Sequence, residues 1–329
     1  MPLSGRVAII GAGHVGATTA YALMLRALFR EIVLIDHNFA LAKAEAADIA
    51  DADALARPVR VWAGDYADAA GADVAVITAG GATHGSQDRL SMAAESAKIV
   101  SQCVGSLVNA GFTGILIVAA NPVDLMTYVA LHQSGLAPKG VIGTGTLLDT
   151  SRLKQSLSVA LRVAPTSVDG FVLGEHGDSE VAAFSTVRIG GLTLDAFCGD
   201  HQHDREATAR EVREAAYEII AGKGYTSFGV ATAVVRICEA VIRDEQAVLP
   251  VSTLLTGQYG LSGLCLSLPC VLGAGGVERV LTPTLSDQET EALIASADVL
   301  SAGLARLGKP PSASIPLRDD AIVDLGRKL

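Results

Sequence analysis

The sequence predicts an α/β protein in which a doubly wound parallel sheet is followed by a second, mixed α+β domain. In the first half of the chain, short apolar runs alternate with Ala-rich stretches of helical character, and a Gly-rich turn follows the first run. Parallel strands that are covered by helices on both faces consist of such continuous apolar runs. Beyond residue 150 the regular alternation ends, and helical segments mix with strand-like runs that glycines interrupt.

The first domain is predicted to span residues 1–145. Parallel neighbours need a crossover connection, and each apolar run in this region is separated from the next by enough residues to supply one. The runs expected to form strands are Val7–Ile10, Ile32–Ile35, Val59–Trp62, Val74–Thr78, Ile115–Val118 and Val141–Ile142.

The second domain is predicted to span residues 146–329. Apolar residues at helical spacing predict a closing helix over Gln288–Leu307, and the Pro- and Ser-containing tail beyond it is expected to be extended, either wrapped on a neighbour or mobile. The remaining expected elements are a helix over Arg152–Leu161, strands over Phe171–Leu173 and Val181–Ile189, a long helical tract over Arg205–Arg243, and strands within Val248–Leu272.

Composition excludes several classes of protein. A 329-residue chain that is 50% hydrophobic can bury a substantial core, and its net charge of -10 argues against a nucleic-acid or anionic-membrane surface. The five cysteines form no CxxC pair, so we expect neither a metal site nor a redox motif. Since no apolar stretch approaches the length of about 18 residues that a membrane span needs, and no export signal is visible, a cytoplasmic protein is expected.

A dinucleotide site is predicted where the first strand meets the first helix. The G-x-G-x-x-G pattern at residues 11–16 lies there, and its glycines permit a tight turn, close approach to a pyrophosphate and close helix packing. Asp36 ends the next apolar run, 20 residues after Gly16, where a carboxylate binds the adenosine ribose and repels a 2′-phosphate. This pattern predicts a Rossmann-type NAD site; the alternative for Asp36 is a turn residue that caps the following helix.

Further cofactor contacts are expected at the carboxyl ends of the fourth and fifth strands, the edge at which open α/β sheets bind ligands. Asn121 can donate to a substrate oxygen or to the nicotinamide ribose, unless it only begins an Asn-Pro turn. The complete set of expected cofactor residues is Gly11, Gly13, His14, Val15, Gly16, Asp36, Thr78, Ala79, Gly80 and Asn121.

A candidate acid/base lies in the segment Gly174-Glu-His-Gly-Asp-Ser179. The pKa of an unperturbed imidazole is near neutral, so His176 can deliver and remove a proton at physiological pH. Asp149 and Arg152 project from one face of a predicted helix, where one can orient a histidine and the other can receive a carboxylate. The alternatives are a structural histidine in a Gly-rich turn and a surface ion pair. Arg89 ends a Gly-rich loop that can close over a substrate, although an arginine there can also be simply solvated.

These motifs, in this order, resemble the L-lactate and malate dehydrogenase family, more closely its lactate branch. The resemblance covers residues 6–307 and also includes Asn121-Pro-Val-Asp124, Gly143-Thr-Gly-Thr-Leu-Leu-Asp149 and Gly222-Lys-Gly-Tyr-Thr226. It implies an NAD-dependent hydride transfer on a small 2-hydroxy acid. The implied roles are proton exchange by His176, orientation of His176 by Asp149, a two-bond grip on the substrate carboxylate by Arg152, carbonyl polarisation by Arg89, assistance at the same oxygen by Asn121, and lining of the pocket by Thr226.

Thr83 is the position that departs most from the family. Lactate enzymes commonly have Gln there and malate enzymes have Arg, whereas this chain has Thr83 followed by His84. Without an arginine a second substrate carboxylate would be buried unpaired, so malate is disfavoured, although a protonated His84 could supply a cation. Lactate and pyruvate are therefore expected first, and bulkier branched or aromatic acids second. An NAD-binding protein that has lost catalysis is the non-enzyme alternative.

Regulation and assembly are also expected to differ from some relatives. Enzymes of this family that fructose 1,6-bisphosphate activates have an arginine and a histidine where this chain has Lys154 and Asp169. A carboxylate repels phosphate, so little activation is expected. By resemblance, the chain is expected to form a homotetramer, with a dimer as the second possibility.

Overall fold

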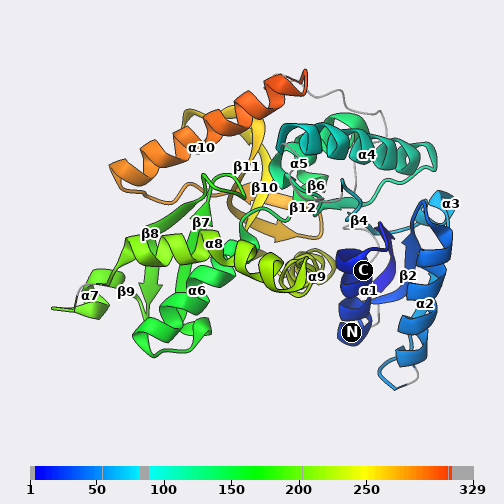
Figure 1. Ribbon diagram of the computed structural model, residues 1–329, viewed down its shortest axis with the longest axis horizontal. Coiled ribbons are helices and arrows are strands. Elements are labelled where there is room, and N and C mark those ends of the chain that lie inside the picture. The colour runs from blue at the N-terminus through cyan, green and yellow to red at the C-terminus, as the bar shows by residue number, and fades with distance from the viewer. Residues whose placement is uncertain (1–3, 54, 82–88, 202, 310, 313–329) are drawn as a thin grey trace.

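A computed structural model describes residues 4–53, 55–81, 89–201, 203–309 and 311–312. It contains a nine-stranded sheet, with strand order β12-β11-β10-β6-β5-β4-β1-β2-β3, and a separate three-stranded sheet, with order β7-β8-β9 (Figure 1). The doubly wound parallel sheet predicted for the first part of the chain is confirmed. Its six parallel strands are β1 (Ser4–Ile10), β2 (Phe29–Ile35), β3 (Arg60–Ala63), β4 (Val74–Ile77), β5 (Ile115–Val118) and β6 (Val141–Gly143).

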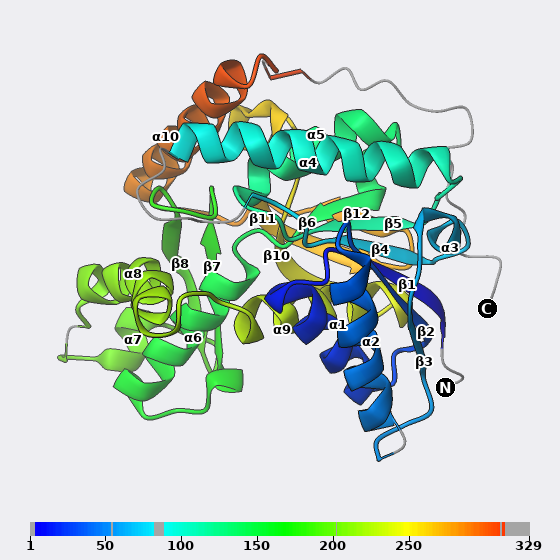
Figure 2. The ribbon, with the colours of Figure 1, turned by 45° about the vertical axis from the view of Figure 1, so that its right-hand side comes forward.

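Helices cover both faces of this sheet, and alternate strand residues supply the two cores. Ile10 and Val33 face one core, whereas Ile9 and Leu34 face the other. Figure 2 shows α4 and α5 on one side and α1, α2 and α9 on the other. The helices of this part are α1 (His14–Arg26), α2 (Phe39–Asp53), α3 (Tyr66–Ala69), α4 (Arg89–Asn109) and α5 (Val123–Ser134), and the later helices α9 (Phe228–Ile242) and α10 (Asp287–Arg306) also pack against the large sheet.

Three strands that the sequence assigns to the second domain extend the large sheet instead. They are β10 (Ala247–Thr256), β11 (Ser262–Gly273) and β12 (Gly276–Val280), and β10 lies antiparallel beside β6 through the pair Ser252 and Gly143. A Cβ on Gly143 would lie 2.8 Å from the Cβ of Ser252, so the missing side chain permits this approach. The division of the chain near residue 145 stays a prediction.

The smaller sheet packs against helices and forms a hydrophobic core with them. Its strands are β7 (Val168–Leu173), β8 (Val181–Ile189) and β9 (Leu192–Thr193), and the surrounding helices are α6 (Leu147–Leu161), α7 (Leu194–Cys198) and α8 (Arg205–Lys223). Apolar side chains of α6, β7, β8 and α8 form this core. The predicted tract over Arg205–Arg243 is wrong in one respect: it is two helices, because Gly224 ends α8 with a left-handed backbone, φ +85°.

Other elements agree with the expectations to within a few residues. The closing helix is confirmed as α10, whose first turn Ser286 caps. Helix α6 begins five residues earlier than the sequence suggests, which places Asp149 inside its first turn. Single 3-10 turns occur at Pro138–Gly140, Pro165–Ser167 and Gln258–Gly260. Within the described ranges, every helix is too short or too polar to cross a membrane. Most of the tail, residues 313–329, lies outside the described residues.

Candidate active site

The glycine-rich turn between β1 and α1 is shaped by two of its three glycines. Gly11 has a φ of +105°, and a Cβ there would lie 2.6 Å from the backbone nitrogen of Ala79. A Cβ on Gly16 would lie 1.8 Å from the carbonyl oxygen of Gly11. Around Gly13, by contrast, a Cβ would meet no described atom within 4 Å. The outer glycines are therefore required by packing, and Gly13 leaves open backbone for a ligand.

The first turn of α1 offers its backbone donors to this open space. Helix α1 begins at His14 after an N-cap at Gly13, and no side chain caps it. Its first turn contains no acidic residue. Because the N–H groups of a helix start carry a partial positive charge, the turn formed by His14, Val15 and Gly16 fits a diphosphate.

Asp36 lies at the end of β2 and is held against the same turn. Its Oδ2 accepts a hydrogen bond of 2.7 Å from the backbone N–H of Ala12. Its Oδ1 accepts one of 2.8 Å from the backbone N–H of Asn38 and lies 2.9 Å from Nδ1 of His37. Asp36 therefore forms a turn with Asn38, but the residue that caps α2 is Asn38, whose side chain accepts from the backbone N–H of Leu41. The Asp36 carboxylate lies beside the glycine loop, where a ribose would bind.

The ends of β4 and β5 complete this edge of the sheet. Thr78 follows β4, and its hydroxyl group donates to the carbonyl oxygen of Gly11 at 2.8 Å. Ala79 is half-buried and Gly80 exposed just beyond it. Asn121 follows β5 and is exposed, before a cis peptide bond to Pro122. Strands β1 and β4 are neighbours from which the strand order runs outward in both directions, so the residues lie at the topological switch point where α/β sheets bind ligands.

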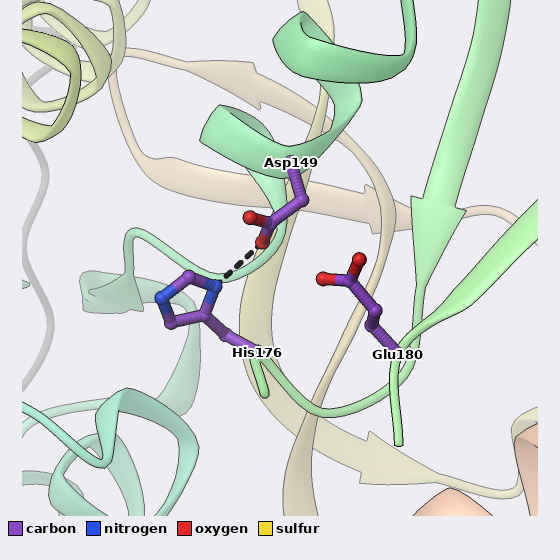
Figure 3. Close-up of side chains that lie close together, drawn as sticks. All are labelled: Asp149, His176 and Glu180. Atoms are coloured by element: carbon purple, nitrogen blue, oxygen red, sulfur yellow. Dashed lines mark hydrogen bonds and ion pairs between the residues drawn. The ribbon is translucent and has the colours of Figure 1, made fainter. Parts of the chain in front are cut away.

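Asp149 links the candidate acid/base to the candidate carboxylate-binding arginine. Oδ2 of Asp149, in α6, lies 2.5 Å from Nδ1 of His176, in the loop between β7 and β8 (Figure 3). Its other oxygen accepts a hydrogen bond of 2.8 Å from Arg152, one turn further along α6. Asp149 is buried, whereas about a quarter of the His176 side chain is exposed. Neither the surface ion pair nor the isolated turn histidine describes this arrangement.

The charges around the pair set its protonation. Burial lowers the proton affinity of His176, but the charge and hydrogen bond of Asp149, with the charges of Asp124 and Glu180, raise the pKa of His176 to about 9. Burial disfavours the ionised form of Asp149, yet His176 and Arg152 hold the pKa of this carboxyl group below its ordinary value. The pair is therefore an imidazolium and a carboxylate at neutral pH.

Asp124 is a supporting residue to which the sequence analysis assigned no role. It lies in the first turn of α5 and is buried. Its Oδ2 accepts a hydrogen bond of 2.8 Å from the backbone N–H of His176, and its Oδ1 accepts one of 3.3 Å from the hydroxyl group of Ser267. Burial raises the pKa of Asp124 to about 6, against the hydrogen bond from the backbone N–H of His176 and the charge of His176. The sequence did contain a signal for this role: Asp124 is the one carboxylate in a largely apolar helical segment that directly follows the Asn-Pro turn.

The segment that contains Thr226 lies beside the first residue of α1, His14. The ring of His14 is stacked on that of Tyr225, with 3.8 Å between centroids, so the segment between α8 and α9 lies beside the glycine-rich turn. Thr226 follows Tyr225 and is half-buried. Lys223 lies over the same tyrosine ring, at 4.3 Å from its centroid.

The closing loop is only partly described. Thr83 and His84 lie outside the described residues. Arg89 is described as the first residue of α4 by its backbone alone. The remaining predicted site residues lie along the carboxyl edge of the large sheet, on α6, in the β7–β8 loop and before α9.

Comparison with known proteins agrees with both parts of this arrangement. Residues 5–143 match the family model described as lactate/malate dehydrogenase, NAD binding domain, and residues 146–307 match the model described as its alpha/beta C-terminal domain. The chain is 42% identical over 300 residues to an L-lactate dehydrogenase of Acetivibrio thermocellus, covering 90% of this chain and 95% of the relative. It is 42% identical over 308 residues to one of Thermus aquaticus, covering 92% and 99%.

Solved structures give the same result. The minor L-lactate dehydrogenase of Enterococcus mundtii in its ligand-bound form superposes with a TM-score of 0.89 at 39% identity, over 92% of this chain and 98% of that one. A lactate dehydrogenase from a deep-sea metagenome library of the Medee basin gives a TM-score of 0.90 at 36% identity, over 93% and 99%.

Proposed function

Because the chain belongs to the lactate/malate dehydrogenase family, we propose that it is an L-lactate dehydrogenase, interconverting (S)-lactate and pyruvate. Members of this family are NAD-dependent oxidoreductases that act on a CH–OH group, and their substrates are small hydroxy and oxo acids. The resemblance inferred from the ordered motifs and the prediction of NAD as the cofactor are confirmed. Lactate itself, and the role of each site residue, are proposals.

NAD held at this site would supply the hydride acceptor for oxidation of the hydroxy acid, and its reduced form the hydride donor for reduction of the oxo acid. Arg152 receives the substrate carboxylate with two parallel hydrogen bonds, which a planar guanidinium can form. Because Nδ1 of His176 faces Asp149, Nε2 is the nitrogen that gives a proton to the substrate oxygen during reduction and takes it back during oxidation. Asp149 stabilises the imidazolium and fixes the direction of its ring.

The implied contributions of the remaining residues complete the proposal. Arg89 and Asn121 act at the substrate oxygen, where they stabilise negative charge as hydride reaches the carbon. Thr226 lines the space around the substrate side chain; Thr83 and His84, to which the resemblance gives the same role, lie outside the described residues. The cofactor is held at the N-terminus of α1 and by the carboxylate at the end of β2.

The observation that carries this proposal is the continuous chain of contacts from Arg152 through Asp149 to His176. One carboxylate serves both the anion-binding group and the acid/base, so the substrate carboxylate and its reacting oxygen are placed at a fixed separation. With NADH and pyruvate the protein is expected to consume NADH, followed near 340 nm, and His176→Gln is expected to abolish this. An inactive wild-type protein that still binds NADH would identify the non-catalytic alternative.

Substrate choice is tested in the same assay. Values of kcat/KM for pyruvate, oxaloacetate, 2-oxobutyrate, 2-oxoisocaproate and phenylpyruvate are expected to be largest for pyruvate. Thr83 is smaller than the usual glutamine, so the second candidate is a bulkier 2-oxo acid. A tenfold preference for any other acid in the series would end the lactate assignment.

We further propose a cytoplasmic homotetramer. Large apolar side chains are exposed on α1, α2 and α8, and their burial between copies of the chain would remove this surface from water. These side chains are Tyr21, Leu25, Phe39, Leu41, Tyr217, Ile219 and Ile220. Sedimentation equilibrium is expected to give about four times the chain mass of 33.7 kDa; twice that mass would indicate the dimer.

A further inference from the structure

Glu180 is a buried carboxyl group beside the active-site pair that the proposed mechanism does not use. It follows the His176 loop, directly before β8, and its residue is 7% exposed. One ligand-type atom of each of Asp149, His176 and Glu180 lies within 4.8 Å of the other two. Figure 3 shows the Glu180 carboxyl group directed toward the Asp149–His176 pair from the opposite side of the loop.

Few hydrogen bonds offset the burial of the Glu180 carboxyl group. Within the described part of the chain, its Oε1 is buried and has no hydrogen-bond partner. A buried ionised carboxylate without partners is costly, so such a group retains its proton. A charged Glu180 would also lie against the carboxylate of Asp149.

The charges that face Glu180 come from two elements besides its own loop. Asp149 and Arg152 lie on α6, Arg213 lies on α8, and His176 lies in the same loop. Burial and the charge of Asp149 raise the pKa of Glu180 to about 8, against the positive charges of His176, Arg213 and Arg152. Asp124, from α5, also faces His176 and favours its protonated form.

A histidine and two carboxylates can also hold a divalent metal. Here the guanidinium of Arg152 lies 2.8 Å from the shared carboxylate of Asp149 and already supplies positive charge to the cluster. A metal ion in the same place would be repelled by it. The cluster is therefore better suited to exchanging a proton.

We propose that Glu180 is a positioning residue for the proton on His176: this buried, unpartnered carboxyl group lies within 4.8 Å of the Asp149–His176 pair, and when it ionises its charge keeps His176 protonated. The inference rests on the proposed function, because it assumes that the His176 proton is the one the reaction uses. As the pH rises through the alkaline range, Glu180 releases its proton to solvent. The new negative charge, within 4.8 Å, then stabilises the imidazolium and extends oxo acid reduction to higher pH.

The test compares Glu180→Gln with the wild type as the pH dependence of kcat/KM in both directions. Glutamine has nearly the same shape but never ionises. The alkaline limb of oxo acid reduction is expected to move down by about one pH unit. Near pH 8.5, reduction is then expected to fall by about threefold, and hydroxy acid oxidation is expected to fall with it, because at unchanged cofactor affinity the equilibrium constant fixes the ratio of the two kcat/KM values at each pH. Near pH 6.5 the two proteins are expected to be equal.

Two matched variants act as controls. Glu180→Asp keeps a titrating carboxyl group and is expected to leave the limb within about half a pH unit of the wild type. Glu211→Gln removes a carboxylate from an exposed position on α8, where Glu211 accepts a hydrogen bond from Ser156, and is expected to change neither limb. An unmoved limb in Glu180→Gln, or a loss of the same size at every pH including pH 6.5, overturns the proposal.

A titration that does not depend on activity separates this inference from the proposed function. The seven histidines can be labelled with ¹³C and His176 assigned by its absence in His176→Gln. The pKa of His176 is expected to be lower in Glu180→Gln than in the wild type. An unchanged His176 pKa overturns the role of Glu180, whereas a lowered pKa in a protein without dehydrogenase activity would refute only the proposed function.

Discussion

Replacing Asp149 with asparagine tests the central contact of the site. The pKa of His176 lies at about 9 against the ordinary 6.5, which corresponds to roughly 3 kcal/mol of stabilisation of the imidazolium. Asp149 is the largest source of this stabilisation, and burial alone would lower the pKa. In Asp149→Asn the pKa of His176 is therefore expected to fall to 6.5 or below. During hydroxy acid oxidation the imidazolium forms in the transition state. Without Asp149 most of this stabilisation is missing there, so the activation free energy rises by most of this amount.

The expected loss is about 100-fold or more in kcat/KM for lactate oxidation, followed by NADH formation at 340 nm near pH 10, where His176 is neutral in both proteins. Reduction of pyruvate is expected to be active only at lower pH, because the fraction of protonated His176 now falls above about pH 6.5. Asp169→Asn removes a carboxylate that is 82% exposed and serves as the control, with an expected change below about twofold. A folded Asp149→Asn protein that keeps its lactate oxidation within tenfold of the wild type, with an unmoved pH profile, would refute the reasoning.

Three further predictions concern the substrate, the cofactor and regulation. Arg152→Lys is expected to lower kcat/KM for pyruvate by roughly 10- to 100-fold with little change in KM for NADH, since an ammonium cannot form two parallel hydrogen bonds; equal effects on both would contradict this. Asp36→Ala is expected to raise the ratio of kcat/KM for NADP to that for NAD by at least about tenfold, and an unchanged ratio would remove Asp36 from the ribose site. Fructose 1,6-bisphosphate is expected to activate less than about twofold, because the ammonium of Lys154 lies 4.0 Å from the carboxylate of Asp169; strong activation at micromolar concentration would show that this carboxylate does not repel phosphate.

The sequence predicted most reliably what depends on local geometry. The apolar run Val74–Ile77 is a strand buried on both faces, and the glycines at residues 11–16 form the turn that their spacing indicates. Asp149 and Arg152 do share a helix face, because three residues nearly complete a helical turn.

Contacts between distant segments were less accessible. Asp124 and His176 are 52 residues apart, and neither position carries a pattern that specifies the bond between them. The break between α8 and α9 was also missed, because an apolar helical pattern continues on both sides of Gly224. The sequence assigned strands β10 to β12 to a separate domain. They join the large sheet through one residue pair between β10 and β6, and no pattern in the sequence indicates this pair.

The sequence by itself determined the fold class, the dinucleotide turn, the candidate acid/base and the family, because periodicity and ordered motifs are properties of the chain. Only the tertiary structure decided which groups share charge. It placed the Asp149 carboxylate between His176 and Arg152, and it buried the carboxyl group of Glu180 beside them. Proton affinity depends on burial and on charges a few ångströms away, and those distances are set by packing between segments that the sequence keeps apart.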